Sequence, residues 1–284
     1  MLTAIRKSDS QKVVGYEIDK DKSESYTCGY CGEVVIHHKS KSQVRIGHFK
    51  HKNSNCPNNV IESTDHILTK KGIKDYLVRK YSRAFQIIEM EKWICNNSIR
   101  PDIYIESTRG RRIAIEVQAS QLTIDQIINR TKKYTRNNIH VLWVLVWKKS
   151  KVSSSPYMLN QYFIAHNCDR FCDHTVKLTE MDLFMHWMNY QKLILWDHEQ
   201  SHSDAGFHIV ELEKFVSEDS EYYDEYGDHQ YHSGRIAKNK KIIVDIHFDV
   251  HFREFYPSHN KKFSIPGKNY ELPDRMQMSW RNKS

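Results

Sequence analysis

The sequence lacks a hydrophobic run long enough to cross a membrane. Its longest apolar stretch, VLWVLVW, covers only residues 141–147, whereas a membrane-spanning helix needs about 20 residues. The N-terminal residues also lack the basic start and apolar core of a secretion signal. These absences predict a cytoplasmic protein with no membrane partner, in which residues 141–147 form a buried strand.

Cysteine is scarce, and half of it lies in one short segment. Six of the 284 residues are cysteine, and three of these are Cys28, Cys31 and Cys56. Because no export signal is evident, the thiols should stay reduced and bind metal instead of forming disulfides. The first two form a C-x2-C knuckle, whose glycines let the chain turn until both sulfurs face one ion.

Two histidines are candidates for the fourth ligand of this metal site. The segment His48-Phe49-Lys50-His51 precedes Cys56 by a few residues. Three thiolates and one imidazole make the closed tetrahedral set that structural zinc requires. His51 has the closer spacing to Cys56, and His48 is the alternative fourth ligand. Either choice predicts a structural zinc ion in an N-terminal module of residues 1–60.

Positive charge is concentrated in the first half of the chain. Residues 1–150 contain 27 Lys and Arg against 15 Asp and Glu, whereas residues 151–284 contain 16 against 20. Basic side chains gain affinity for a polyanion by releasing phosphate counterions. The asymmetry predicts a nucleic-acid partner, with DNA favoured over RNA. No segment has the pattern of a recognition helix, so no base preference is predicted.

A hairpin at residues 100–118 offers a second metal site. Two strand-prone runs, residues 102–105 and 112–118, are joined by a Ser-Thr-Arg-Gly turn. Period-two alternation puts Glu116 and Gln118 on one face, and the hairpin should bring Asp102 beside Glu116. Two adjacent carboxylates repel unless a cation lies between them, and hard oxygen ligands suit Mg²⁺ or Mn²⁺.

These motifs, taken in order, resemble the competence protein CoiA family, whose members join a small zinc-binding region to a PD-(D/E)XK nuclease-like domain. The resemblance covers roughly residues 1–148. It rests on the cysteine and histidine clusters together with Glu62-Ser63, His66, Lys70, Pro101-Asp102 and Glu116-x-Gln118. Gln118 stands where the nuclease signature most often has a lysine that orients or activates the attacking water.

The resemblance implies a metal-dependent nuclease that hydrolyses phosphodiester bonds. Asp102, Glu116 and the carbonyl oxygen of Val117 would hold Mg²⁺ or Mn²⁺, and Gln118 would orient the water. A helix starting at Ser63 or Thr64 and ending near Tyr81 places Glu62, His66 and Lys70 on one face. Glu62 and His66 would then bind metal waters or the substrate phosphate.

Further phosphate contacts are expected from basic and aromatic side chains on two helices. The candidates are Lys70 on the first helix and Arg130, Lys133 and Tyr134 on a second helix at residues 121–136. The alternative interpretation of the second helix is an ordinary solvated face.

The order of expected elements predicts the fold class. Helix, three strands, helix and strand follow one another over residues 61–150, which is the αβββαβ order of a restriction-endonuclease-like core with a mixed α/β sheet. The Ser- and Lys-rich segment 148–156 predicts a domain boundary. Residues 151–284 then form a C-terminal α+β domain of unknown fold, with a helix expected at residues 181–196.

Absence of the signature lysine leaves a second functional hypothesis. The chain could be a catalytically inactive nucleic-acid-binding module on a nuclease fold that assists recombination or transformation. Partner proteins in recombination, DNA uptake or defence against phage DNA suit either hypothesis. The sequence predicts no oligomeric state.

Overall fold

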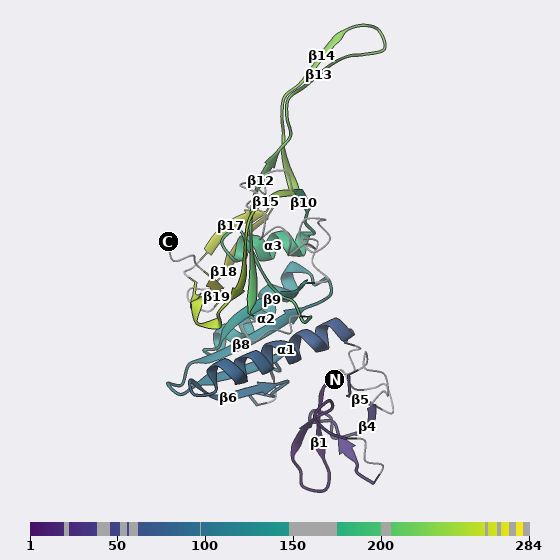
Figure 1. Ribbon diagram of the computed structural model, residues 1–284, viewed down its shortest axis with the longest axis vertical. Helices are drawn as coiled ribbons and strands as arrows, with labels where there is room; N and C mark the ends of the chain where they lie inside the picture. Colours follow the sequence, from purple (N-terminus) through teal and green to yellow (C-terminus); the bar gives the residue numbers. More distant parts are fainter. Residues whose placement is uncertain are drawn as a thin grey trace. The chain divides into compact units, whose positions relative to one another are not determined.

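The computed structural model describes most of the chain in two compact units. The residues described are 1–19, 23–38, 46–51, 56, 62–96, 98–147, 175–199, 206–258, 261–265, 268–272 and 277–280. Unit 1 contains residues 1–119, 131–146 and 198–200, and unit 2 contains residues 120–130, 147–197 and 201–284 (Figure 1). The expected boundary segment 148–156 lies outside the described residues.

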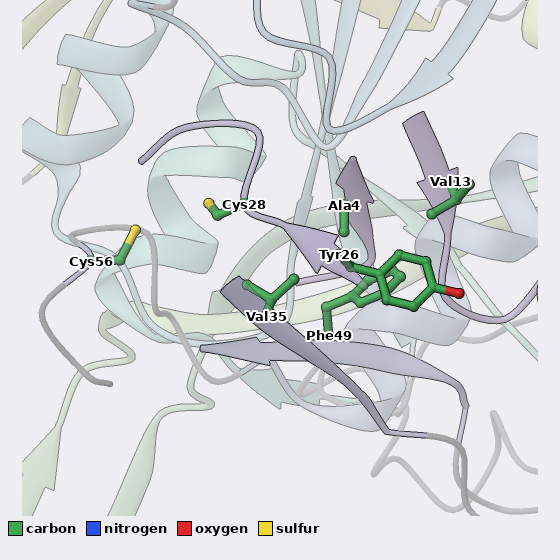
Figure 2. Close-up of a cluster of buried hydrophobic side chains, with 7 residues drawn as sticks. All are labelled: Ala4, Val13, Tyr26, Cys28, Val35, Phe49 and Cys56. Carbon is green, nitrogen blue, oxygen red and sulfur yellow. The ribbon is translucent and has the colours of Figure 1, made fainter. Parts of the chain in front are cut away.

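Unit 1 begins with a five-stranded antiparallel sheet in the order β2-β1-β3-β4-β5, which contains the residues of the expected zinc module. The strands are β1 (Thr3–Arg6), β2 (Lys12–Val14), β3 (Tyr26–Thr27), β4 (Val34–His38) and β5 (His48–His51). Figure 2 shows its small core, in which Cys28 and Cys56 lie at one end of a cluster of apolar side chains. A core of this size needs an additional cross-link such as a structural metal.

The remainder of unit 1 has the predicted αβββαβ order, which confirms the fold class. Its elements are α1 (Thr64–Tyr81), β6 (Phe85–Met90), β7 (Ile103–Ser107), β8 (Arg112–Gln118), α2 (Ile124–Arg136) and β9 (His140–Val146). The strands lie in the order β9-β8-β7-β6. β8 and β9 are parallel, whereas β7 pairs antiparallel with both β6 and β8, so the sheet is mixed. The first half of α2 belongs to unit 2.

Local sequence explains why α1 and the β7–β8 hairpin begin and turn where they do. Ser63 caps α1 by accepting a hydrogen bond from the backbone N–H of His66 at 3.3 Å. The hairpin turns at Gly110, whose φ of 77° is easily adopted only by glycine. Ile103 pairs with Ile115 across the hairpin, so Asp102 and Glu116 are the next residues along the two strands.

Unit 2 is mostly antiparallel. Four strands lie in the order β10-β15-β12-β11, and three two-stranded sheets pair β13 with β14, β16 with β19 and β17 with β18. The elements are β10 (Thr175–Lys177), α3 (Glu180–Met188), β11 (Lys192–Trp196), β12 (Phe207–Val216), β13 (Ser220–Tyr223), β14 (His229–His232), β15 (Ile236–Val250), η3 (Phe252–Glu254), β16 (Phe255–Pro257), β17 (Lys261–Ile265), β18 (Lys268–Leu272) and β19 (Met278–Trp280).

The helix expected at residues 181–196 is shorter than predicted. It ends at Met188, and Tyr190 and Gln191 have φ angles of 57° and 63°, which interrupt the helix before β11. Among the described residues, the structure contains no helix that is both long and apolar enough to span a membrane.

Candidate metal centres and catalytic cluster

Cys28, Cys31, His51 and Cys56 form the first of two candidate metal centres. One ligand atom from each lies within 4.8 Å of the others. Sγ of Cys31 lies 3.4 Å from Nε2 of His51. Three sulfurs and one nitrogen at this spacing fit the closed tetrahedral coordination of structural zinc.

The turn after β3 arranges the cysteine knuckle. The backbone N–H of Tyr30 donates to Sγ of Cys28 at 3.4 Å, and the N–H of Gly32 donates to the carbonyl oxygen of Cys28 at 3.0 Å. Gly32 has a φ of 73°, a conformation for which glycine is best suited. The turn therefore holds the two cysteines of the C-x2-C motif on one side.

His51, and not His48, contributes the histidine of this centre. The two residues are three positions apart on β5, so their side chains leave opposite faces of the strand. Nδ1 of His48 lies 3.0 Å from the carbonyl oxygen of Ile46, and its ring stacks on that of His38 at 5.8 Å between centroids. Of the two histidines that the sequence offered, His51 is therefore the one that lies with the three cysteines.

Glu62, His66 and Asp102 form the second candidate metal centre, which is the candidate for catalysis and is called the catalytic cluster below. One ligand atom from each lies within 4.8 Å of the others. Nδ1 of His66 lies 3.1 Å from Oε1 of Glu62, and Nε2 lies 3.4 Å from Oδ2 of Asp102. Nε2 also donates to the carbonyl oxygen of Val117 at 3.0 Å. The start of α1 and the β7–β8 hairpin thus meet at one point.

Lys70 lies beneath this cluster and is completely buried. Its Nζ is 2.5 Å from Oε1 of Glu62, 2.8 Å from Oε1 of Glu91 and 3.5 Å from Oδ1 of Asp102. The expectation that Lys70 contacts nucleic acid is therefore not met, because three carboxylates of the protein surround its ammonium group. Burying a charge is costly unless it is paired in this way.

These contacts keep the cluster ionised. Burial alone would raise the pKa of Asp102, but His66 and Lys70 outweigh it and hold the pKa below its ordinary range. Burial also raises the pKa of Glu62, and Lys70 reverses this effect to give a pKa of about 2. For His66, burial lowers the pKa, but Asp102 raises it to about 10. At neutral pH Glu62 and Asp102 are therefore ionised and His66 is protonated, so a divalent ion that used a His66 nitrogen would have to displace its proton.

Glu116 and Gln118 are buried near the cluster but are not grouped with it. The hydroxyl of Tyr134 on α2 donates a hydrogen bond to the Glu116 carboxylate, and Glu116 and Gln118 are 3% and 7% exposed. The group of gathered ligand atoms contains Asp102 with Glu62 and His66 and does not include Glu116, so the expected pairing of Asp102 with Glu116 stays a prediction.

The expected phosphate contacts on α2 divide into two classes. Tyr134 is 2% exposed and its hydroxyl is bonded within the protein, so it does not offer a surface to nucleic acid. Arg130 and Lys133 are exposed. Of the three expected contacts on α2, these two basic side chains have the accessibility that contact with a phosphate needs, and Lys132 and Arg136 on the same helix are also exposed.

Glu91 is a buried charged residue that sequence reasoning missed. It follows β6 and is 3% exposed. Burial raises its pKa, but Lys70 overcomes this effect and lowers the pKa to about 2. A glutamate at the end of a strand usually lies in solvent, so the sequence gives no signal for its burial beyond the basic residues around it.

A family model described as the nuclease-like domain of competence protein CoiA matches residues 62–220. The chain belongs to this family. The match begins at Glu62 and includes every residue of the catalytic cluster, so the CoiA resemblance of the sequence is confirmed. The zinc-site cysteines precede the matched region, which extends past residue 148. No curated protein and no solved structure matches this CoiA-family chain.

Proposed function

We propose that this CoiA-family protein is a metal-dependent nuclease that hydrolyses phosphodiester bonds, with DNA as its main substrate. The observation that carries the proposal is the convergence of Glu62, His66 and Asp102 within 4.8 Å at one end of a nuclease-like core. The basic first half of the chain supports a polyanionic substrate.

Donor chemistry at the cluster fits a divalent ion. Oε2 of Glu62 is buried and has no hydrogen-bond partner among the described residues, so it is available to bind a cation. Glu62 and Asp102 would supply carboxylate oxygens and Val117 a carbonyl oxygen, and His66 would supply a ring nitrogen once the ion had displaced its proton. Oxygen donors suit Mg²⁺, and the imidazole makes Mn²⁺ an equal candidate. A divalent ion here supplies Lewis-acid chemistry, which polarises the phosphate and acidifies water.

Lys70 would supply the positive charge that the motif lacks at Gln118. Its Nζ approaches Oδ1 of Asp102, whereas Oδ2 faces His66 and accepts the N–H of Val117 at 2.9 Å. Lys70 thereby keeps Asp102 ionised and fixes the direction in which Oδ2 points. Because the ammonium group already occupies the space between Glu62, Glu91 and Asp102, we infer that the cluster binds a single divalent ion.

The second metal of the proposal is structural zinc at Cys28, Cys31, His51 and Cys56. The four ligand atoms form a closed set that leaves no position for substrate. The zinc would hold the small module folded and would take no part in hydrolysis. A cytoplasmic location, where thiols stay reduced, suits this ligand set.

DNA cleavage by matched variants tests the proposal. Purified protein is incubated with plasmid and linear DNA in Mg²⁺ or Mn²⁺, with and without chelator. We expect cleavage by the wild type and by Asp75→Asn, whose carboxylate lies on an exposed part of α1. Asp102→Asn and Glu62→Gln should lose at least about 100-fold in rate. Equal cleavage by Asp102→Asn would contradict the assignment.

The alternative is a binding module that no longer cuts. It is favoured by Gln118 at the lysine position and by the hydrogen bond that holds Glu116 to Tyr134. Tight DNA binding without cleavage by the wild type, under every metal condition, would select it. Identifying neighbouring genes would then separate a role in DNA uptake and recombination from one in defence against invading DNA.

A further inference from the structure

Glu91 lies between the zinc module and the catalytic cluster and contacts both. It has a φ of 50°, a left-handed conformation that a non-glycine residue adopts only where its surroundings hold it. Its carboxylate is almost fully buried. A strained backbone around a buried charge points to a role that a solvated glutamate could not perform.

The carboxylate of Glu91 binds the first strand of the zinc module. It accepts the backbone N–H of Leu2 at 3.2 Å, the N–H of Thr3 at 3.3 Å and the hydroxyl of Thr3 at 3.1 Å. The backbone carbonyl oxygen of Glu91 accepts Nζ of Lys12 at 3.2 Å. Both β1 and β2 are therefore attached to this one residue.

A short path of backbone hydrogen bonds leads from these contacts to the zinc ligands. Ile5 on β1 pairs with Thr27 on β3, and Cys28 follows Thr27 directly. Zinc binding restrains Cys28 and the end of β3. Because β1 is hydrogen-bonded to β3, the N–H groups that Glu91 accepts are restrained with it.

Two contacts lead from Glu91 to the catalytic cluster. Oε1 lies 2.8 Å from Nζ of Lys70, which in turn lies 3.5 Å from Oδ1 of Asp102. The backbone N–H of Glu91 donates to the carbonyl oxygen of Asp102 at 3.1 Å. Glu91 thus restrains the main chain of Asp102 directly and its carboxylate through Lys70.

We propose that Glu91 is a positioning residue that couples zinc binding in the N-terminal module to divalent-ion binding at the catalytic cluster. The inference rests on the proposed function, because it assumes that the cluster holds a catalytic ion. Zinc restrains the positions of β3 and of β1, which is paired with it. The N–H groups at the start of β1 hold the Glu91 carboxylate in place, and Glu91 in turn holds Lys70 and the main chain of Asp102 in place. Coupling of this kind is reciprocal, so each ion must tighten the binding of the other.

Equilibrium zinc affinity of the wild-type protein provides the first test. The full chain is titrated with a colorimetric zinc chelator that does not bind Mg²⁺, with and without saturating Mg²⁺. We expect Mg²⁺ to lower the zinc Kd by at least about fivefold. The same titration of Asp102→Asn should show no effect of Mg²⁺. An unchanged zinc Kd in the wild type would overturn the coupling.

Two Glu→Gln variants separate coupling from simple attachment of the module. Glu17 pairs with Lys74 on α1 at 2.6 Å, so it joins the module to the core without touching the cluster. Glu91→Gln should reduce the Mg²⁺ effect on zinc Kd to less than about twofold and raise the Mn²⁺ Kd about tenfold. Glu17→Gln should keep both wild-type values. Equal behaviour of the two variants would overturn the role of Glu91.

A milder variant covers the case in which Glu91→Gln does not fold. Thr3→Val removes one hydroxyl hydrogen bond to Glu91 and nearly preserves side-chain volume. It should retain the fold and reduce the Mg²⁺ effect on zinc Kd by about half. Full retention of the effect in Thr3→Val, with Glu91→Gln unfolded, would overturn the proposed path through β1.

Direct Mn²⁺ binding, measured by electron paramagnetic resonance, distinguishes failure of the coupling from failure of the proposed function. If the wild type binds Mn²⁺, Asp102→Asn does not, and the zinc Kd is insensitive to Mg²⁺, only the coupling is overturned. If Mn²⁺ binding does not depend on Asp102, both proposals are overturned.

Discussion

Sγ of Cys31 and Nε2 of His51 lie 3.4 Å apart, although the two residues are twenty positions apart in the chain. A histidine three positions earlier on the same strand is directed away from the sulfurs. The face of β5, and not residue type alone, therefore decides which histidine lies with the three cysteines.

The two histidines of β5 should differ in their effect on zinc content. We expect His51→Ala to lower the zinc content of purified protein from one equivalent to well below half, because it removes one of four ligands. His48→Ala should retain one equivalent. Metal analysis by mass spectrometry after dialysis checks both variants. If only His48→Ala lost zinc, His48 would be the ligand and the assignment of His51 would be wrong.

Lys70 should contribute strongly to stability. Lys70→Met leaves Glu62, Glu91 and Asp102 without their shared cation, so the free energy of unfolding should fall by about 3–5 kcal/mol. Lys71→Met is the matched control, because Lys71 forms a partly exposed pair with Asp75 and lies over the Tyr16 ring, and its loss should change stability by about 1 kcal/mol or less. Urea unfolding measures both.

Lys70 should strengthen Mn²⁺ binding at the cluster, because it keeps Asp102 ionised and fixes the direction of its carboxylate. A cation that binds only the folded protein raises its unfolding temperature by mass action. The increase in Tm on adding Mn²⁺ should therefore be smaller for Lys70→Met than for the wild type. A larger increase would show that Lys70 competes with, and does not assist, a cation at this position.

The hydroxyl of Tyr134 should matter for stability and not for DNA affinity. Tyr134→Phe leaves the buried Glu116 carboxylate without the hydroxyl hydrogen bond, at an expected cost of about 1–3 kcal/mol. Measured in an Asp102→Asn background, DNA affinity should stay within twofold. Lys133→Gln should instead reduce affinity and the salt dependence of binding, since Lys133 is exposed.

His186 should make unit 2 sensitive to acid. Burial lowers its pKa to about 4, against an ordinary value of 6.5, and Nδ1 has no hydrogen-bond partner among the described residues. Because the unfolded chain binds the proton first, stability should be constant above pH 6.5 and fall as the pH drops to 4. The loss should be about 3 kcal/mol, and urea unfolding of His186→Gln should show a flatter profile in that range.

Patterns that repeat along the chain predicted much of the fold. The Ser63 cap, the Gly110 turn and the buried run at residues 141–147 are local signals, and each produced the expected element. The C-x2-C knuckle is equally local, and its sulfurs meet Cys56 as expected. The predicted helix extended too far beyond the end of α3, because apolar residues continue from α3 into β11. The left-handed residues between these two elements, Tyr190 and Gln191, are not of types that mark a helix end in the sequence.

Contacts between distant elements could not be predicted in the same way. Strand alternation placed Glu116 correctly on a face but gave no indication that the Tyr134 hydroxyl on α2 would bind it. Helical spacing aligned Lys70 with Glu62 but did not show that Glu91 and Asp102 would enclose the ammonium group. Such contacts depend on how helices pack on the sheet, which pairwise spacing in the chain does not encode.

The approach of Lys70 to Asp102 affects how distant relatives can be recognised. A linear pattern that demands lysine two positions after the strand glutamate passes over this chain, because Gln118 stands there. A spatial criterion would include this chain if it required any ammonium group within about 4 Å of the aspartate that precedes the first hairpin strand, which is Asp102 here. Searches that use this geometry should recover family members in which the lysine comes from a helix, as Lys70 does, and not from the strand position of Gln118.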